Sequence, residues 1–157
     1  MSTNNNSVYL NIKRHGGHYY VTLRAIYNTS DKAYTENIDF ILDTGAFITV
    51  ISRNIAELFG YDKLPKIPSK IKGYTGETPA DFVRIPGLEV LNIELVDVPI
   101  LIPHSKELKQ NILGLSVLEY FEYSIETKND KMYINLNTNP RHYHKILECG
   151  QVIVNTL

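Results

Sequence analysis

Apolar and polar residues alternate with a period of two over the first part of the chain, which is the pattern of strands that bury one face. Residues 8–13 and 20–27 alternate in this way on either side of Gly16 and Gly17. Two alternating runs joined by a glycine pair predict a β-hairpin. The polar stretch over residues 28–36 is expected to form a loop.

A further strand is predicted over residues 38–43, because Ile38, Phe40 and Leu42 fall on one face of an extended chain. This strand would bring Asp43 to its end. Apolar residues also follow this aspartate in the sequence. The aspartate is therefore expected to lie inside the core, between two apolar runs.

A short helix is predicted over residues 53–59, with Ser52 as the residue that caps its start and Gly60 as the residue that ends it. Ser, Thr, Asp and Asn satisfy free N–H groups at helix starts, and glycine accepts the left-handed backbone found at helix ends. The expected apolar stripe of this helix consists of Ile55, Leu58 and Phe59.

Strand patterns return after the helix. Pro65 and Pro68 are expected to frame a loop, and residues 71–85 predict two strands around a glycine-bearing turn. Pro79 lacks an N–H group and is best tolerated at an unpaired strand edge. A hairpin of this kind at the edge of a sheet can move.

The last part of the readable pattern combines strands with one more helix. Residues 88–102 are strand-rich, and a helix is predicted over 115–121 from apolar residues that recur at spacing three. Residues 123–127 and 132–136 predict a final hairpin. Breaks in the strand-rich stretch are expected at Asp97 and Pro99.

The whole pattern predicts an all-β fold with two short helices. Residues 1–7 are expected to be disordered, residues 8–137 to form one domain, and residues 138–157 to form a tail in which 152–154 could add a terminal strand. Alternating strands are compatible both with a sandwich and with a closed barrel.

Composition narrows the functional classes. The 157 residues are 43% hydrophobic and carry a net charge of −1, with 16 basic and 17 acidic residues, so neither a nucleic-acid partner nor a membrane partner is expected. The single cysteine, Cys149, cannot form an internal disulfide, which suits a reducing compartment. Without a signal-like start, the protein is expected to be soluble and cytoplasmic.

Metal chemistry is not expected from the histidines. His142 and His144 form a close pair, but no cysteine or carboxylate cluster at ligand spacing accompanies them. The sequence also lacks a glycine-rich phosphate-binding loop. No metal and no organic cofactor are therefore predicted.

The candidate chemistry lies in the triplet Asp43, Thr44 and Gly45. A buried carboxylate costs several kcal/mol unless it is hydrogen-bonded, paired or protonated, so its place between apolar runs indicates a function. The alternative is a structural turn in which Asp43 caps its own backbone.

A second motif, Ile112-Leu113-Gly114, follows far downstream and precedes the second predicted helix. Together with the run from Asp43 to Ala46, it resembles the retropepsin family, the retroviral-type aspartic proteases and their relatives. The resemblance covers about residues 35–137. It implies a small closed barrel of the acid-protease type.

Hydrolysis of a peptide bond by carboxylates needs two of them around one water. The chain contains one Asp-Thr-Gly triplet, so the second carboxylate must come from another copy, and a two-fold dimer would place one Asp43 opposite the other. The resemblance implies the same homodimer, with Thr44 hydrogen-bonding across it and Gly45 letting the backbone approach the substrate.

The resemblance also implies supporting residues. Ala46, Ile112, Leu113 and Gly114 would pack beneath the catalytic loop. Relatives often carry a polar residue directly after that glycine, whereas this chain has Leu115, so one inter-subunit ion pair of the family is not expected here. The residues expected in the flap over the substrate are Gly73, Tyr74, Thr75 and Gly76.

These observations predict an aspartic endopeptidase that acts as a homodimer on peptide or protein substrates. The alternative is a non-catalytic dimeric β-barrel that binds extended peptides by strand addition, in which Asp43 is kept for the structure of its loop.

Overall fold

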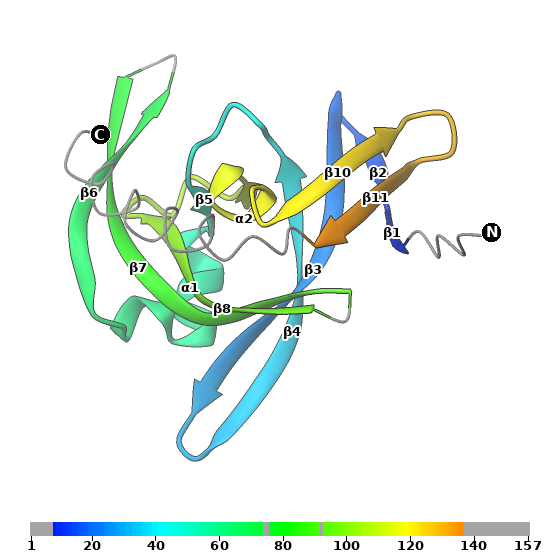
Figure 1. Ribbon diagram of the computed structural model, residues 1–157. Helices are drawn as coiled ribbons and strands as arrows, with labels where there is room; N and C mark the ends of the chain where they lie inside the picture. Colours follow the sequence, from blue (N-terminus) through cyan, green and yellow to red (C-terminus); the bar gives the residue numbers. More distant parts are fainter. Residues whose placement is uncertain (1–7, 74–75, 92, 137–157) are drawn as a thin grey trace.

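The computed structural model describes residues 8–73, 76–91 and 93–136, which form two antiparallel-rich sheets and two short helices (Figure 1). The larger sheet has eight strands, in the spatial order β2 (Lys13–His15), β3 (His18–Thr29), β4 (Lys32–Leu42), β9 (Ile112–Leu113), β5 (Thr49–Val50), β8 (Ile93–Pro103), β7 (Gly76–Val90) and β6 (Lys66–Gly73). The smaller sheet has three, in the order β1 (Val8–Asn11), β11 (Lys131–Leu136) and β10 (Phe121–Glu126).

The larger sheet closes on itself because β3 also pairs with β7, where Ile26 lies opposite Gly87. A Cβ atom on Gly87 would lie 2.8 Å from the carbonyl oxygen of Leu95 and 3.0 Å from Cδ1 of Ile26. Glycine therefore permits the close approach that completes a barrel of six strands. The predicted all-β class and the closed barrel are confirmed.

The barrel is filled by the inward faces of its strands. On β4, Ile38 and Phe40 are buried as the alternation predicted. Burying an aliphatic or aromatic side chain of this size contributes about 1.5–3 kcal/mol. The largest fully buried side chains include Leu23, Phe40, Ile51, Ile85, Leu88, Ile100 and Ile102. This packing fixes the end of β4, from which Asp43 emerges.

The first helix, α1 (Arg53–Phe59), begins and ends as predicted. The Ser52 hydroxyl accepts a hydrogen bond from the Ile55 N–H at 3.4 Å, and Gly60 ends the helix in the left-handed region at φ 75°. The expected apolar stripe is wrong at Leu58, whose side chain is 72% exposed. Ala56 and Phe59 are the helix residues that are buried.

The prediction of a loop over residues 28–36 is wrong. β3 and β4 run through this stretch as a hairpin whose turn is Ser30-Asp31, with Ser30 at φ 53°. This hairpin projects away from the barrel (Figure 1), and both of its faces are exposed there. Strands without a buried face carry no alternation, so their polar sequence resembles that of a loop.

Three further boundaries differ from the prediction. β6 already starts at Lys66 and includes Pro68, which an edge strand tolerates. β8 continues through both expected breaks. Its register with β7 is the same on either side of Asp97, which has φ 51°, and Pro99 pairs with Arg84. The second helix, α2 (Leu115–Leu118), ends early.

The shortened α2 has a simple cause. Phe121 continues the apolar spacing of the helix but is the first residue of β10, so one apolar pattern serves two elements. The two hairpins expected at Gly16-Gly17 and in the 123–136 region are present as β2–β3 and β10–β11. β1, however, pairs with β11 instead of joining the first hairpin.

The segments expected to form a disordered start, 1–7, and a tail with a possible strand, 138–157, lie outside the described residues. The domain limits 8 and 137 therefore stay predictions. Among the described residues, no helix is long and apolar enough to cross a membrane.

Candidate active site

The two sequence motifs meet where β4 and β9 run side by side. These strands are parallel, with Ile41 opposite Ile112 and Leu42 opposite Leu113. The Asp43 N–H then donates a hydrogen bond to the Leu113 carbonyl at 3.1 Å. The start of the Asp-Thr-Gly loop is thus bonded directly to the second motif.

The loop itself is a tight turn around the Asp43 carboxylate. The Gly45 N–H donates to Asp43 Oδ1 at 2.9 Å, and the Ala46 N–H donates to the Asp43 carbonyl at 3.2 Å. Asp43, Thr44 and Gly45 are exposed in the single chain, so the expected burial of the carboxylate is wrong. The flanking residues Phe40 and Ile48 are buried, and the loop leaves the core between them.

Gly114 supports this loop from below. A Cβ atom at this position would lie 2.7 Å from the Ala46 carbonyl oxygen and 3.0 Å from the backbone of Ile48. The following residues hold the same loop, since the N–H of Leu115 donates to the Ala46 carbonyl at 2.9 Å. The Ser116 N–H reaches the next carbonyl along the loop at 2.8 Å. Only glycine lets the two backbones pack this closely.

A buried polar pair that the sequence analysis missed completes the support. The side chains of Thr49 and Ser116 are almost inaccessible, at 0% and 2% exposure. The Gly114 N–H donates to Thr49 Oγ1 at 3.0 Å, and the Thr49 N–H donates to Ser116 Oγ at 2.9 Å. The Ser116 hydroxyl in turn donates to the Pro99 carbonyl at 3.4 Å. These hydrogen bonds connect the chain at Thr49, after the Asp43 loop, to α2 and to β8.

The Asp43 loop forms one side of a cleft of about 510 Å³, and the stem of the β6–β7 hairpin forms another. The lining is mainly apolar. It consists of Asp43, Gly45, Ala46, Phe47, Ile48, Val50, Ile71, Lys72, Gly73, Leu101 and Ile112. The candidate carboxylate thus lies in the same cleft as the hairpin expected to cover it.

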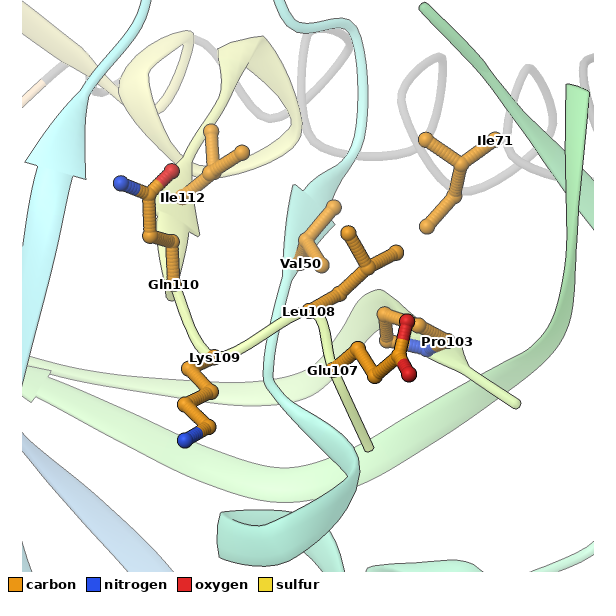
Figure 2. Close-up of a pocket in the computed structure, with 8 residues that line it drawn as sticks. All are labelled: Val50, Ile71, Pro103, Glu107, Leu108, Lys109, Gln110 and Ile112. Atoms are coloured by element: carbon orange, nitrogen blue, oxygen red, sulfur yellow. The ribbon is translucent and has the colours of Figure 1, made fainter. Parts of the chain in front are cut away.

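A second pocket of about 440 Å³ continues this cleft and shares Val50, Ile71 and Ile112 with it (Figure 2). Its outer side is formed by residues 107–110. Figure 2 shows Val50, Ile71 and Leu108 among the side chains that line this pocket. The two pockets together form a groove.

The hairpin expected to act as a flap is present as β6–β7, which projects beyond the barrel (Figure 1). Gly73 pairs with Gly76, and Gly76 has φ 125°, which favours glycine. Tyr74 and Thr75 lie outside the described residues. The role of these residues as a flap stays a prediction.

Metal ligands do not gather in the described part of the chain, where no group of three or more His, Cys, Asp and Glu side chains could hold an ion. The histidine pair His142 and His144 lies outside the described residues.

Comparisons with known proteins agree with this geometry. The model of a family described as aspartyl protease matches residues 31–117, more than half of the chain. A crystal structure of a retropepsin-like aspartic protease from Rickettsia conorii superposes with a TM-score of 0.59 and 21% sequence identity, covering 83% of this chain and 91% of that one. The comparison with curated protein sequences gave no significant match. The chain therefore belongs to the aspartyl protease family and has the retropepsin-like fold that its motifs predicted.

Proposed function

We propose that the protein is an aspartic endopeptidase whose active site is shared by two copies of the chain, with one Asp43 carboxylate from each. The observation that carries this proposal is the position of Asp43 at an exposed loop tip, inside an apolar cleft and facing the stem of a projecting hairpin. Membership of the aspartyl protease family supports peptide hydrolysis as the reaction class.

The mechanism needs two carboxylates in different protonation states around one water. The ionised carboxylate takes a proton from the water as the water oxygen attacks the carbonyl carbon of the peptide. The protonated carboxyl group donates its proton to the carbonyl oxygen, giving a neutral tetrahedral intermediate. Transfer of a proton to the amide nitrogen then lets the C–N bond break, which releases an acid and an amine.

The second copy is required because one chain supplies only one Asp-Thr-Gly triplet. In a two-fold dimer each residue on the axis meets its own counterpart, so the exposed tips of two loops can face one another. Phe47, two residues after the triplet, is 43% exposed, and a partner or substrate would cover it. Thr44 is proposed to hydrogen-bond across this interface, and Gly45 to leave room for the substrate backbone.

The substrate is proposed to be an extended peptide with apolar side chains near the cleaved bond. The groove is lined mainly by aliphatic residues and Phe47, and burying apolar side chains there is favourable. The β6–β7 hairpin, with Gly73 and Gly76 at its described end, is proposed to close over the peptide and exclude water. The cytoplasmic location expected from the sequence stays a prediction.

The test is the Asp43→Asn variant, measured by cleavage of a diverse peptide mixture over a series of pH values. An amide of the same size keeps the loop but cannot act as a base, so we expect cleavage to disappear while folding is retained. Asp97→Asn is the matched control, because Asp97 is exposed on β8 outside the groove and asparagine also accepts its positive φ. Cleavage that persists in Asp43→Asn would remove Asp43 from the mechanism.

The wild-type rate is expected to follow a bell-shaped pH profile with an acidic to weakly acidic optimum, because one carboxylate must be ionised and the other protonated. A transition-state mimic containing statine should suppress it. The alternative function is a non-catalytic dimeric barrel that binds extended peptides, favoured by the hydrogen bond from Gly45 N–H to Asp43 Oδ1. It predicts peptide binding without cleavage.

A further inference from the structure

A charged cluster around the buried carboxylate of Asp81 lies beside the groove and joins three segments of the chain. Arg53 at the start of α1 places its guanidinium 3.1 Å from Asp81 Oδ2 in β7, and His104, directly after β8, places Nε2 2.9 Å from Asp81 Oδ1. The Asp81 and Arg53 side chains are 11% and 12% exposed, whereas His104 is 50% exposed. The reaction mechanism uses none of these residues.

The cluster anchors one end of residues 104–111, which we call the wall segment. The Arg53 Nε–H donates to the Pro103 carbonyl at 2.9 Å, and the His104 N–H donates to the Pro79 carbonyl at 3.0 Å. Beyond this point the wall segment contains neither helix nor strand. Four of its residues, 107–110, line the outer pocket of the groove (Figure 2).

The other end of the wall segment is held by Asn111. Its side-chain oxygen accepts a hydrogen bond from the Ser52 N–H at 2.9 Å, and its amide donates to the Asp39 carbonyl at 3.3 Å. The wall segment is therefore bonded at both ends. Its position relative to the barrel depends on Asn111 at one end and on the Asp81 cluster at the other.

Asp81 and Pro79 also belong to the stem of the β6–β7 hairpin. Pro68 lies opposite Asp81, and Lys70 lies opposite Pro79, so β6 is held in the same register. β6 carries Ile71, which lines both pockets of the groove. The cluster thus connects the hairpin stem, on one side of the groove, with the wall segment, on the other.

The surroundings of Asp81 favour the ionised form of its carboxyl group. Burial raises the pKa of this carboxyl group, but hydrogen bonds from His104 and Arg53, with the charges of His104 and Lys66, hold the pKa below its ordinary value. Hydrogen bonds to a charged group are stronger than those between neutral groups. The carboxylate can therefore hold α1, β7 and the wall segment together.

We propose that Asp81 is a positioning residue that, through Arg53 and His104, fixes the wall segment against the stem of the β6–β7 hairpin and so sets the width of the substrate groove. The inference rests on the proposed function, since it assigns the groove to the substrate. Loosening the cluster should weaken substrate binding more than it slows the chemical step, because no member of the cluster lines the cleft that contains Asp43.

The test compares Asp81→Asn, His104→Ala and His104→Gln with the wild type. Glutamine keeps a neutral donor near the position of Nε2, so His104→Gln should restore what His104→Ala loses. Glu57→Gln is the matched control, because it removes an exposed ion pair of 3.0 Å between α1 and Lys106 of the same wall segment. Exposed pairs of this kind contribute little to stability.

Hydrogen exchange is measured first, without substrate. In Asp81→Asn and His104→Ala we expect amides of the wall segment and of residues 76–81 to exchange at least about tenfold faster, with the rest of the barrel unchanged. Peptide cleavage then gives KM and kcat. We expect KM to rise by about five- to tenfold and kcat to stay within about twofold, with His104→Gln and Glu57→Gln close to the wild type.

Exchange that is unchanged, or that rises throughout the barrel, would overturn the proposal. So would a local exchange change without a change in KM, or equal effects of His104→Ala and His104→Gln. Failure of the proposed function looks different, since the wild type would then cleave no peptide. In that case the same local exchange pattern, with weaker binding of extended apolar peptides, would still support the positioning role of Asp81.

Discussion

Gly114 shows most directly how one residue determines the geometry of the site. The Gly114→Ala variant would place a Cβ atom 2.7 Å from the Ala46 carbonyl oxygen, a backbone atom that cannot rotate away as a flexible side chain would. Overpacking of this kind costs about 1–3 kcal/mol. We expect a lower free energy of unfolding in urea and a larger loss of cleavage than of stability, because the Asp43 loop must shift.

Gly73→Ala is the matched control for stability, because nothing lies within 4 Å of the position that its Cβ would occupy. It should leave the free energy of unfolding nearly unchanged. If Gly114→Ala and Gly73→Ala had equal stability, the close contact beneath the Asp43 loop would not matter energetically.

Thr49 and Ser116 allow a second prediction at the same scale. Thr49→Val keeps the shape of the side chain but removes the hydroxyl that accepts a hydrogen bond from the Gly114 N–H. Ser116→Ala removes the hydroxyl that accepts a hydrogen bond from the Thr49 N–H. Each loss should cost about 1–3 kcal/mol. Because the two side chains belong to one network, urea unfolding of both single variants and the double variant should show non-additive effects. Additive costs would mean that the two sites act independently.

These residues mark the limit of what the sequence could predict. Asp43 and Gly114 were found because each stands in a recognisable motif. Thr49 gave only a weak signal, a hydroxyl within an apolar run, and its partner Ser116 is distant in the sequence. The Arg53–Asp81 pair gave none, since a contact between distant residues depends on the three-dimensional fold.

At the scale of elements, prediction succeeded where a strand or helix has one buried face. α1 was predicted to the residue because capping signals are local, and β4 was predicted over its buried half. Prediction failed over residues 28–36, because the hairpin there has no buried face. It also failed at the end of α2, because Phe121 continues the apolar spacing of the helix but belongs to β10. Burial, not intrinsic strand preference, produced the signals that could be recognised.

The cluster of Asp81, Arg53 and His104 joins separate elements, and it predicts that the free energy of unfolding differs between the wild type and Asp81→Asn in a pH-dependent way. The folded-state pKa of Asp81 is lowered, so its stabilising contribution is present above the unfolded-state pKa and is lost as the pH falls through the folded-state value. At neutral pH we expect Asp81→Asn to reduce the free energy of unfolding by about 1.5–3 kcal/mol. The difference from the wild type should shrink below about pH 4, since a protonated carboxyl group resembles the amide.

Urea unfolding of both proteins over a pH series measures this difference. Asp97→Asn is again the control, because its side chain is exposed and should give a small difference at every pH. If the free energies of unfolding of Asp81→Asn and the wild type differed by the same amount at acidic and neutral pH, the carboxylate charge would not be what stabilises the cluster.

At the scale of the whole molecule, the barrel explains how separate motifs meet. Within the closed barrel β4 and β9 are paired in parallel, so the Asp-Thr-Gly loop rests on the second motif. Alternation alone allowed a sandwich or a barrel, and the motifs decided between them. The exposure of Asp43, Thr44 and Gly45 in the single chain was not predicted, because apolar residues flank the triplet on both sides and the sequence pattern does not show that the loop leaves the core.

The last prediction concerns assembly. If each chain carries half of the site, specific activity must fall when the protein is diluted below its dimer dissociation constant. Excess Asp43→Asn chains should also inhibit the wild type, because most wild-type chains would then pair with a partner that lacks the second carboxylate. Excess Asp97→Asn chains should not inhibit, since these keep Asp43. Constant activity far below the concentration at which sedimentation detects monomers, without inhibition by Asp43→Asn chains, would place the whole catalytic site within one chain.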